Sequence, residues 1–444
     1  MPKSYSENDL MEILYNAVGR SGEVGTKSAF TLQLAASYNK SSKELNVSGK
    51  SGYALGLLQY DFGARSDIKD SSSNLTGINL LIGSYNAWAA GNGQTALTPN
   101  EQKQLSDDLR TRGPEFVGPS GHASDRYMVQ GDPLRAKIDQ FLTSDAGLQY
   151  VHALDTSVLK TSKGFAGLLP FAQQVAGSPT VQNMSDRDSE CAIAALSKIF
   201  NQNPQVAGEI VSSLKGQSMD FEKLEAHISS QIAQSKHLGT SSKASLSSGV
   251  AATVRGMKLI DDIRSSPVLG PLWSASVSQD PSLESDFSKP PAKQLFDSML
   301  RNPDAGEQVL AAIDSGQSVL IPTSKDSAKE SYIAGVATDG TLFAMDGQGA
   351  GRAYANGDWT PFLNGGGLAE QNRHGQWEIA SHSHAEHLAA DSESLGPTAS
   401  NTPPRTSELA SDPMSTYLQL AAEVAEDTDA LTGNQANIRS FRFR

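Results

Sequence analysis

The spacing of apolar residues predicts a helix near the N-terminus, followed by a short β-rich stretch. Within residues 6–18, apolar side chains recur every three or four positions, as on one face of a helix. Gly19 and Gly22 are expected to end this helix, which would place Glu23 at its end or in the next turn. Residues 28–63 change to short apolar or alternating runs separated by Ser, Asn and Gly, which indicates a small sheet or a set of hairpins.

Helical periodicity returns at about residue 77 and continues to about 234. One of these helices has a clear start signal, because Thr98 can cap it, a proline follows, and Glu101 completes a capping box. Residues 236–291 are rich in Ser and Pro and predict a linker that holds one helix around 248–264.

The C-terminal part predicts a second, smaller unit of unknown role, such as targeting or loading. Residues 292–390 begin with helical runs and continue with strands, and Asp339-Gly340 is a typical hairpin turn. Residues 391–444 predict a disordered segment, a short helix and a basic tail, NIRSFRFR. We therefore expect an α+β fold: a mainly helical domain over 1–235 with a small β-rich insertion, then the linker and a smaller C-terminal α/β unit.

Composition and charge narrow the function classes. Of the 444 residues 38% are hydrophobic, enough for a packed core over part of the chain. The formal net charge of −13 argues against nucleic-acid binding as the main function, because phosphate contacts need clustered Lys and Arg. The single cysteine, Cys191, excludes an internal disulfide framework and a Cys-based zinc cluster. Its apolar helical setting predicts a buried thiol.

The sequence has no charged leader followed by a long apolar run at its start. No stretch approaches the ~18 consecutive apolar residues that a membrane span needs. We therefore expect no membrane span and synthesis in the cytoplasm without a signal peptide. Work outside that compartment would then require a delivery route other than general secretion.

Two carboxylates in the first domain are candidates for acid–base chemistry on a sugar. Glu23 follows an amphipathic helix whose buried face could supply the poorly hydrated surroundings that a proton donor needs. Asp61 is the second candidate, and it could position water, stabilise positive charge on the sugar or act as a base. An Asp before an aromatic residue and a Gly is also a common turn anchor, so both interpretations of Asp61 remain open.

The stretch SGYALGLLQYDFG, residues 51–63, is the predicted floor of a saccharide cleft. Glycines let the backbone approach a polysaccharide, and the polar and aromatic residues between them offer hydrogen bonds and stacking surfaces. The aromatic residues could equally belong to the core. The candidate substrate-binding residues are Ser51, Tyr53, Gly56, Gln59 and Tyr60.

These residues resemble the goose-type lysozyme and soluble lytic transglycosylase superfamily. In those enzymes a catalytic Glu closes a helix and a Gly-Leu-Met-Gln motif lines the cleft. The matching positions are Glu23 and, 33 residues later, the motif Gly56-Leu57-Leu58-Gln59. The longer stretch also resembles lysozyme-like domains of bacterial antagonism effectors and of some phage lysins. The resemblance covers about the first 230 residues and about ten positions. Val24 stands where transglycosylases usually have Ser, which favours simple hydrolysis.

The resemblance implies a glycoside hydrolase, a muramidase that cuts the β-1,4 bond between N-acetylmuramic acid and N-acetylglucosamine in peptidoglycan. It implies Glu23 as the general acid. Asp61 or a water-positioning polar group would assist from the opposite face, and we expect no cofactor or metal. As an antibacterial effector, the protein would be exported by a secretion system, act in the periplasm of a target cell and meet an immunity protein there. A phage lysin, a lytic transglycosylase and a non-catalytic glycan-binding or structural protein remain alternatives.

A cluster of histidines in SHSHAEHLAA is a separate candidate. His382, His384 and His387, with Glu386 beside the last, could bind zinc or another transition metal. Three histidines at this spacing also occur at exposed polar ends of domains. A metal site in the C-terminal unit is therefore a third function hypothesis.

Overall fold

The structure is a computed structural model. Its chain divides into two compact units, and each is described by itself. The first holds the described residues up to Asp262 together with Val277 and Ser278, and the second holds Ile263–Ser276 and the described residues from 291 onward. The described residues are 4–25, 29–34, 36–39, 44–47, 51–65, 75–110, 133–162, 165–214, 216–278, 291–315, 319–322, 333–336, 342–345, 351–355, 358–361, 369–371 and 377–379.

The first unit begins with the predicted amphipathic helix. In α1 (Glu7–Glu12) the Ser6 hydroxyl accepts a hydrogen bond from the Asp9 amide, and the Asp9 carboxylate accepts one from the Ser6 amide. The helix continues as a π-helix, η1 (Ile13–Val24), in which ten of the twelve residues are buried. A π-helix is rare in proteins. The usual form is a single-turn π-bulge inside an α-helix, and such bulges are often found at functional sites.

The prediction that Gly19 and Gly22 end this helix is wrong, because η1 passes through both. The two glycines instead allow close packing. A Cβ at Gly19 would lie 3.2 Å from the Cβ of Leu57, and a Cβ at Gly22 would lie 2.0 Å from the Oγ1 of Thr253. Glycine therefore allows close approach at both positions, by Leu57 at Gly19 and by Thr253 at Gly22, and both partners are distant in the sequence.

The β-rich stretch predicted over 28–63 is confirmed where the structure describes it. A three-stranded antiparallel sheet has the order β1-β4-β5, and a separate antiparallel hairpin pairs β2 with β3. The bounds are β1 (Gln33–Leu34), β2 (Ala36–Asn39), β3 (Glu44–Val47), β4 (Tyr53–Leu55) and β5 (Tyr60–Asp61).

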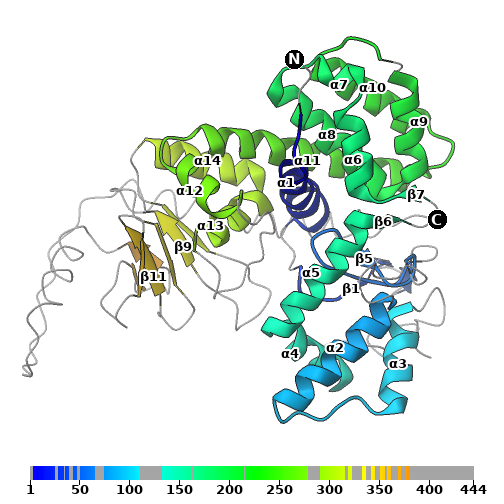
Figure 1. The fold of residues 1–444 in the computed structure, drawn as a ribbon, viewed down its shortest axis with the longest axis vertical. Coiled ribbons are helices and arrows are strands. Elements are labelled where there is room, and N and C mark those ends of the chain that lie inside the picture. Colours follow the sequence, from blue (N-terminus) through cyan, green and yellow to red (C-terminus); the bar gives the residue numbers. More distant parts are fainter. Residues whose placement is uncertain are drawn as a thin grey trace, which may run out of the picture. The chain divides into compact units, whose positions relative to one another are not determined.

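The helical series that follows is also confirmed, including the capping box between Thr98 and Glu101. Helix α8 has the largest number of buried residues among these helices and packs against η1, α6 and α9 (Figure 1). The elements are α2 (Gly77–Gly91), α3 (Pro99–Arg110), α4 (Pro133–Leu142), α5 (Asp145–Lys160), β6 (Thr161–Ser162), β7 (Phe165–Ala166), α6 (Leu168–Ala176), α7 (Pro179–Gln182), α8 (Asp186–Gln202), α9 (Pro204–Leu214), α10 (Phe221–Gln234) and α11 (Thr240–Ser265). Cys191 of α8 is buried as expected, and burial raises the pKa of its thiol to about 12.

The Ser- and Pro-rich segment holds more regular structure than the one helix expected there. Helix α11 is 26 residues long, and α12 (Leu269–Ser276) follows it. The Ser-rich composition hides a buried apolar stripe on α11 that recurs every three or four residues: Leu246, Val250, Val254, Met257 and Ile260. This stripe explains a long packed helix where composition alone predicts mostly linker.

The second unit combines helices with antiparallel strands. Within it, Trp273 of α12 packs edge-on against Phe296 of α13, with ring centroids 4.8 Å apart. A five-stranded sheet has the order β12-β11-β10-β9-β8, and each of its pairings is antiparallel. The bounds are α13 (Pro291–Arg301), α14 (Pro303–Asp314), β8 (Val319–Pro322), β9 (Ile333–Val336), β10 (Leu342–Met345), β11 (Gly351–Ala355), β12 (Asp358–Pro361), β13 (Ala369–Gln371) and β14 (Trp377–Ile379).

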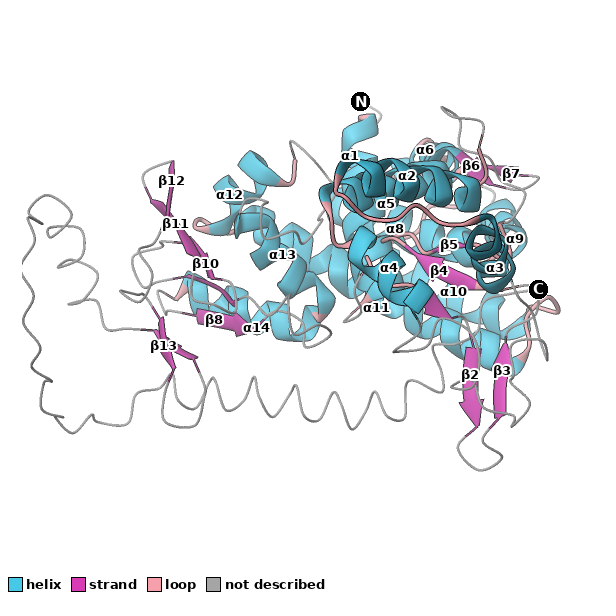
Figure 2. Cartoon of the chain, turned by 90° about the horizontal axis from the view of Figure 1, so that it is seen from below, coloured by secondary structure: helices cyan, strands magenta, loops and turns pink. Residues whose placement is uncertain are grey.

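Strands β9 and β10 pair as expected for the predicted hairpin, whose turn residues Asp339 and Gly340 lie outside the described residues. The segment 391–444 lies outside them as well. Figure 2 shows that helix predominates over strand in the described chain, so the fold is helix-rich and of the broad α+β class. Within the described residues, no helix combines the length and the apolar character that crossing a membrane requires.

Candidate active site

Glu23 lies in the last turn of η1, and its side chain is 3% exposed. The carboxylate forms an ion pair with Lys198 of α8, with 2.8 Å between Oε1 and Nζ. The Lys198 side chain is completely buried. The prediction placed Glu23 near a helix end with buried surroundings, and the structure adds a fully buried cation as its partner.

Two amide side chains of α8 complete the surroundings of Glu23. Asn201 donates from Nδ2 to the Glu23 Oε1 at 2.8 Å, and Gln202 donates from Nε2 to Oε2 at 3.4 Å. Lys198, Asn201 and Gln202 are three and four residues apart, so they project from one face of the helix. Asn201 Nδ2 also lies 3.3 Å from the Leu58 carbonyl oxygen. Through this one amide, Glu23 is joined to the Gly-Leu-Leu-Gln segment.

The segment from Gly56 to Gln59 forms a tight turn between β4 and β5. Gly56 has φ +88° and Gln59 has φ +56°, both in the left-handed region. The Gln59 amide nitrogen and its side-chain Nε2 both donate to the Gly56 carbonyl, at 3.2 and 2.9 Å. The Gln59 side chain is thus folded onto its own turn, and the residue is only 5% exposed.

Asp155 of α5 holds this turn from the other side. Its two carboxylate oxygens accept hydrogen bonds from the backbone amides of Leu57 and Leu58, at 3.0 and 2.8 Å. Asp155 is 2% exposed. Sequence reasoning missed this residue, although a signal existed. An acid stands in the apolar helical run LQYVHALDTSVL, four residues after the buried Val151.

Asp61 acts as a turn anchor in the structure. Its Oδ1 accepts hydrogen bonds from three backbone amides, those of Gly52, Gly63 and Ala64, at 3.0, 2.9 and 2.8 Å. Asp61 is 2% exposed. Of the two interpretations open for this residue, the hydrogen bonds match the turn anchor.

The other predicted sugar-contacting residues are buried. Ser51 is fully buried, Tyr53 is 5% exposed and Tyr60 is 1% exposed. The Tyr60 hydroxyl donates to the Arg65 carbonyl at 3.0 Å, and burial raises the pKa of the phenol to about 12. The guanidinium of Arg135 lies over the Tyr53 ring, 5.9 Å from its centroid. Both tyrosines are therefore core residues packed around the turn.

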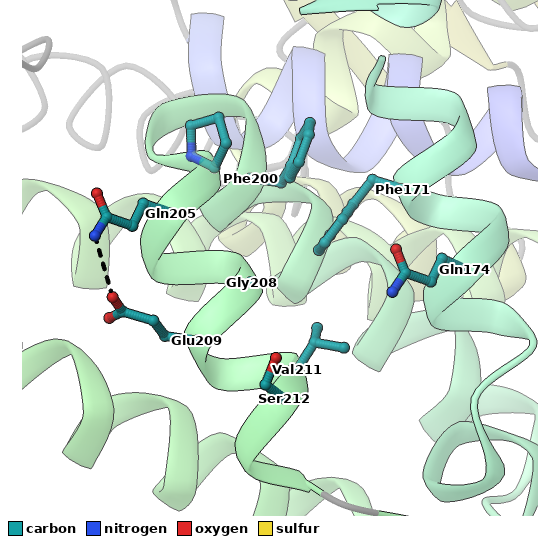
Figure 3. Close-up of a pocket in the computed structure, with 9 residues that line it drawn as sticks. Phe171, Gln174, Phe200, Gln205, Gly208, Glu209, Val211 and Ser212 are labelled. Carbon is teal, nitrogen blue, oxygen red and sulfur yellow. Dashed lines mark hydrogen bonds between the residues drawn. The ribbon is translucent and has the colours of Figure 1, made fainter. Parts of the chain in front are cut away.

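A groove of about 630 Å³ lies between α6, α8 and α9 (Figure 3). Phe171 and Phe200 stack in it, with ring centroids 4.2 Å apart, and Gln205 donates a hydrogen bond to Glu209 on its rim at 3.3 Å. The lining residues are Phe171, Gln174, Phe200, Pro204, Gln205, Gly208, Glu209, Val211 and Ser212. Phe200 directly precedes Asn201 in the sequence, but none of Glu23, Lys198, Asn201 and Gln202 lines the groove.

Of the predicted site residues, the structure joins Glu23 to the motif turn, and Asp61 pairs with Ala54 in the adjoining strand. The sequence analysis did not identify Lys198, Asn201 and Gln202 as site residues. For Lys198 the sequence does contain a sign of a buried charge, since this residue stands in the apolar run CAIAALSKIF.

Within the described residues, no group of three or more His, Cys, Asp or Glu could hold a metal ion. His382, His384, Glu386 and His387 lie outside them.

No protein-family model matches this chain, and comparisons with curated proteins and with solved structures give no match. The likeness to the lysozyme superfamily therefore rests on the residues themselves.

Proposed function

We propose that this chain is a peptidoglycan hydrolase, a muramidase in which Glu23 is the general acid. The observation that carries the proposal is the link through Asn201, which binds the Glu23 carboxylate and the Leu58 carbonyl with one amide. The proposal thereby assigns the acid and the Gly-Leu-Leu-Gln motif, 33 residues apart in the sequence, to one site. A carboxyl fixed in position suits proton donation to a glycosidic oxygen once it is protonated.

The proposal divides the work among the residues around this carboxyl. Glu23 protonates the leaving oxygen as the glycosidic C–O bond breaks, and a water molecule attacks the sugar carbon. The proton that this water loses passes to solvent, from which the Glu23 carboxylate is reprotonated. Asp61 and Asp155 hold the backbone of the cleft floor. Gln202 controls access, because its contact with the Glu23 Oε2 is long, at 3.4 Å, and the residue is partly exposed. Rotation of that side chain opens Oε2 to a saccharide.

The biological setting in this proposal follows from the resemblance to antagonism effectors. The protein is delivered by a secretion system, cuts peptidoglycan in the periplasm of a target cell and is neutralised there by an immunity protein. A phage lysin performs the same chemistry in a different setting. Muropeptides with anhydro ends would instead assign lytic transglycosylation.

A second candidate function is glycan binding without cleavage. It is favoured by the Glu23–Lys198 pair, because a fully buried ion pair joining two helices also makes sense as a purely structural contact. In that case Glu23 would never transfer a proton, and the protein would bind sacculi without releasing fragments.

The test is mass spectrometry of fragments released from purified sacculi by the wild type and by Glu23→Gln. We expect the wild type to release muropeptides with reducing ends and the variant to release none. Because Gln at 23 leaves Lys198 buried without its counter-charge, Glu23→Gln alone is expected to lose about 3–5 kcal/mol of stability.

The matched control is the double variant Glu23→Gln with Lys198→Met, which removes both charges and recovers most of that stability. We expect it to fold and to be inactive. Lysis by the double variant would refute Glu23 as the acid, and a wild type that binds sacculi but releases nothing would favour the glycan-binding alternative.

A further inference from the structure

Gly249 of α11 leaves space for the end of the Lys198 side chain. A Cβ added at Gly249 of α11 would lie 2.5 Å from the Lys198 Cε and 3.2 Å from its Nζ. Glycine in the interior of a helix costs about 0.5–1 kcal/mol relative to alanine. Position 249 thus accepts a poor helix former, and this leaves space for the charged end of the lysine.

The position of Lys198 has a direct consequence for the protonation of Glu23. Burial alone favours the neutral carboxylic acid, whereas a cation within about 4–6 Å favours the carboxylate. The Lys198 ammonium is 2.8 Å away and equally buried, so it opposes the effect of burial. The amide donors of Asn201 and Gln202 act in the same direction as the ammonium, because hydrogen bonds to the charged form stabilise it.

Other charged groups belong to the elements around this site. Arg65, after β5, donates to the Asn201 Oδ1 at 3.4 Å. Asp155 of α5 is bound to the amides of Leu57 and Leu58. Arg20 precedes Glu23 by one turn of the same helix and is fully buried. Lys198 is in direct contact with the Glu23 carboxylate, at 2.8 Å, and it favours the ionised form of that carboxyl.

We propose that Lys198 is a positioning residue that holds Glu23 ionised and so sets the pH at which Glu23 can donate a proton. The inference rests on the proposed function, in which Glu23 must be protonated to act. The activity of the wild type then falls as the pH rises and Glu23 ionises. Removal of the ammonium moves that fall to higher pH by about 1–3 units.

Two variants test this in complementary ways. Lys198→Met removes the charge and keeps the length of the side chain. Gly249→Ala keeps every charge but occupies the space of the Lys198 Cε, so the end of the lysine side chain must shift from its place beside Glu23. The control is Gly83→Ala on α2, where a Cβ would meet nothing within 4 Å. If Lys198→Met does not fold, Gly249→Ala carries the test.

The first readout is the pH profile of reducing ends released from sacculi, and the second is the titration of the Glu23 carboxyl followed by carbon NMR. The NMR signal is assigned by its absence in the Glu23→Gln/Lys198→Met double variant, and it requires no catalysis. We expect both the activity profile and the carboxyl titration to move to higher pH in Lys198→Met and in Gly249→Ala, and neither to move in Gly83→Ala.

The outcomes separate the two proposals. An active wild type with unchanged pH profiles and carboxyl titrations in both variants would overturn the role of Lys198 and leave Glu23 as the acid. A carboxyl titration that moves as expected, in a protein that releases nothing from sacculi at any pH, would keep the effect of Lys198 on Glu23 and reject the hydrolase.

Discussion

The Asp155 carboxylate leaves room only for glycine at position 56. A Cβ at Gly56 would lie 2.5 Å from the Asp155 Oδ1 and 3.0 Å from its Cγ, and the residue has φ +88°. The carboxylate that closes this space also binds the next two backbone amides. The glycine of the Gly-Leu-Leu-Gln motif is thus required by Asp155, which lies 99 positions later in the chain.

Gly56→Ala should therefore destabilise the first unit. The left-handed backbone alone costs a residue with a Cβ about 1–2 kcal/mol, and the displacement of Asp155 adds to that. Chemical unfolding measures the loss. Gly83→Ala is the matched control and should be neutral or stabilising by up to about 1 kcal/mol, because a Cβ there has open space. Equal stability of the two variants would contradict the packing seen at position 56.

Features that depend on residues close in the sequence could be predicted, whereas features that depend on distant partners could not. The amphipathic helix, the β-rich stretch and the helical series follow from local periodicity, and all three are present. Asp155 and Lys198 both stand in apolar helical runs, where an isolated charge signals a buried partner. The sequence alone could not identify those partners, because the pairing depends on how α5 and α8 pack.

Three glycines also depend on partners that the local sequence does not reveal. Gly19 and Gly22 look like helix stops in a local pattern, and Gly249 looks like a flaw in a Ser-rich helix. Each instead lies where another segment approaches: Leu57, Thr253 and Lys198, respectively. Asp61 was ambiguous for a related reason, since a turn anchor and a catalytic acid share the same residue type and the same local sequence.

The contact between Gly22 and Thr253 predicts a compensating pair of substitutions. Gly22→Ala should cost about 1–3 kcal/mol of stability, because the new Cβ would lie 2.0 Å from the Thr253 Oγ1. In a Thr253→Ala background the cost should shrink, giving a coupling energy of at least about 0.5 kcal/mol in a double-mutant cycle. Thr253→Val is the control, because it restores an atom in place of Oγ1 and should give no relief. Additive effects in the Ala cycle would exclude direct contact.

Glu101 predicts a contribution to stability that disappears in acid. A hydrogen bond from Lys137 at 2.5 Å, together with the amide and hydroxyl of Thr98, lowers the pKa of its carboxyl from 4.5 to about 2. Because the folded-state pKa is the lower one, the contribution is complete above about pH 5 and is lost progressively as the pH falls towards 2. The pair is partly exposed, so the contribution should stay below about 1 kcal/mol at neutral pH.

Urea unfolding of the wild type and Glu101→Gln checks this. The stability difference between the two proteins should be larger at pH 7 than at pH 3. Lys137→Met should reproduce most of the effect, since Lys137 is the main cause of the lowered pKa. A difference that is the same at both pH values would show that Glu101 gains nothing from ionisation in the folded state.

Asn201 is the residue on which the proposed site depends for its geometry, and its truncation gives a prediction that separates positioning from bulk stability. Asn201→Ala removes the amide that binds both the Glu23 carboxylate and the Leu58 carbonyl. Misplacement of a reacting group by about 1 Å can cost about 100-fold in rate, so we expect release of reducing ends from sacculi to fall by 10- to 100-fold. Gln202→Ala removes only the longer, 3.4 Å contact and should keep most of the activity. Both variants should remain folded at the assay temperature, which circular dichroism can verify.

In the proposed site a saccharide reaches the Glu23 Oε2 past Gln202, so Gln202→Ala should also have a lower KM than Asn201→Ala. A larger loss of activity in Gln202→Ala than in Asn201→Ala would mean that the link between Glu23 and the motif turn is not what orients the acid.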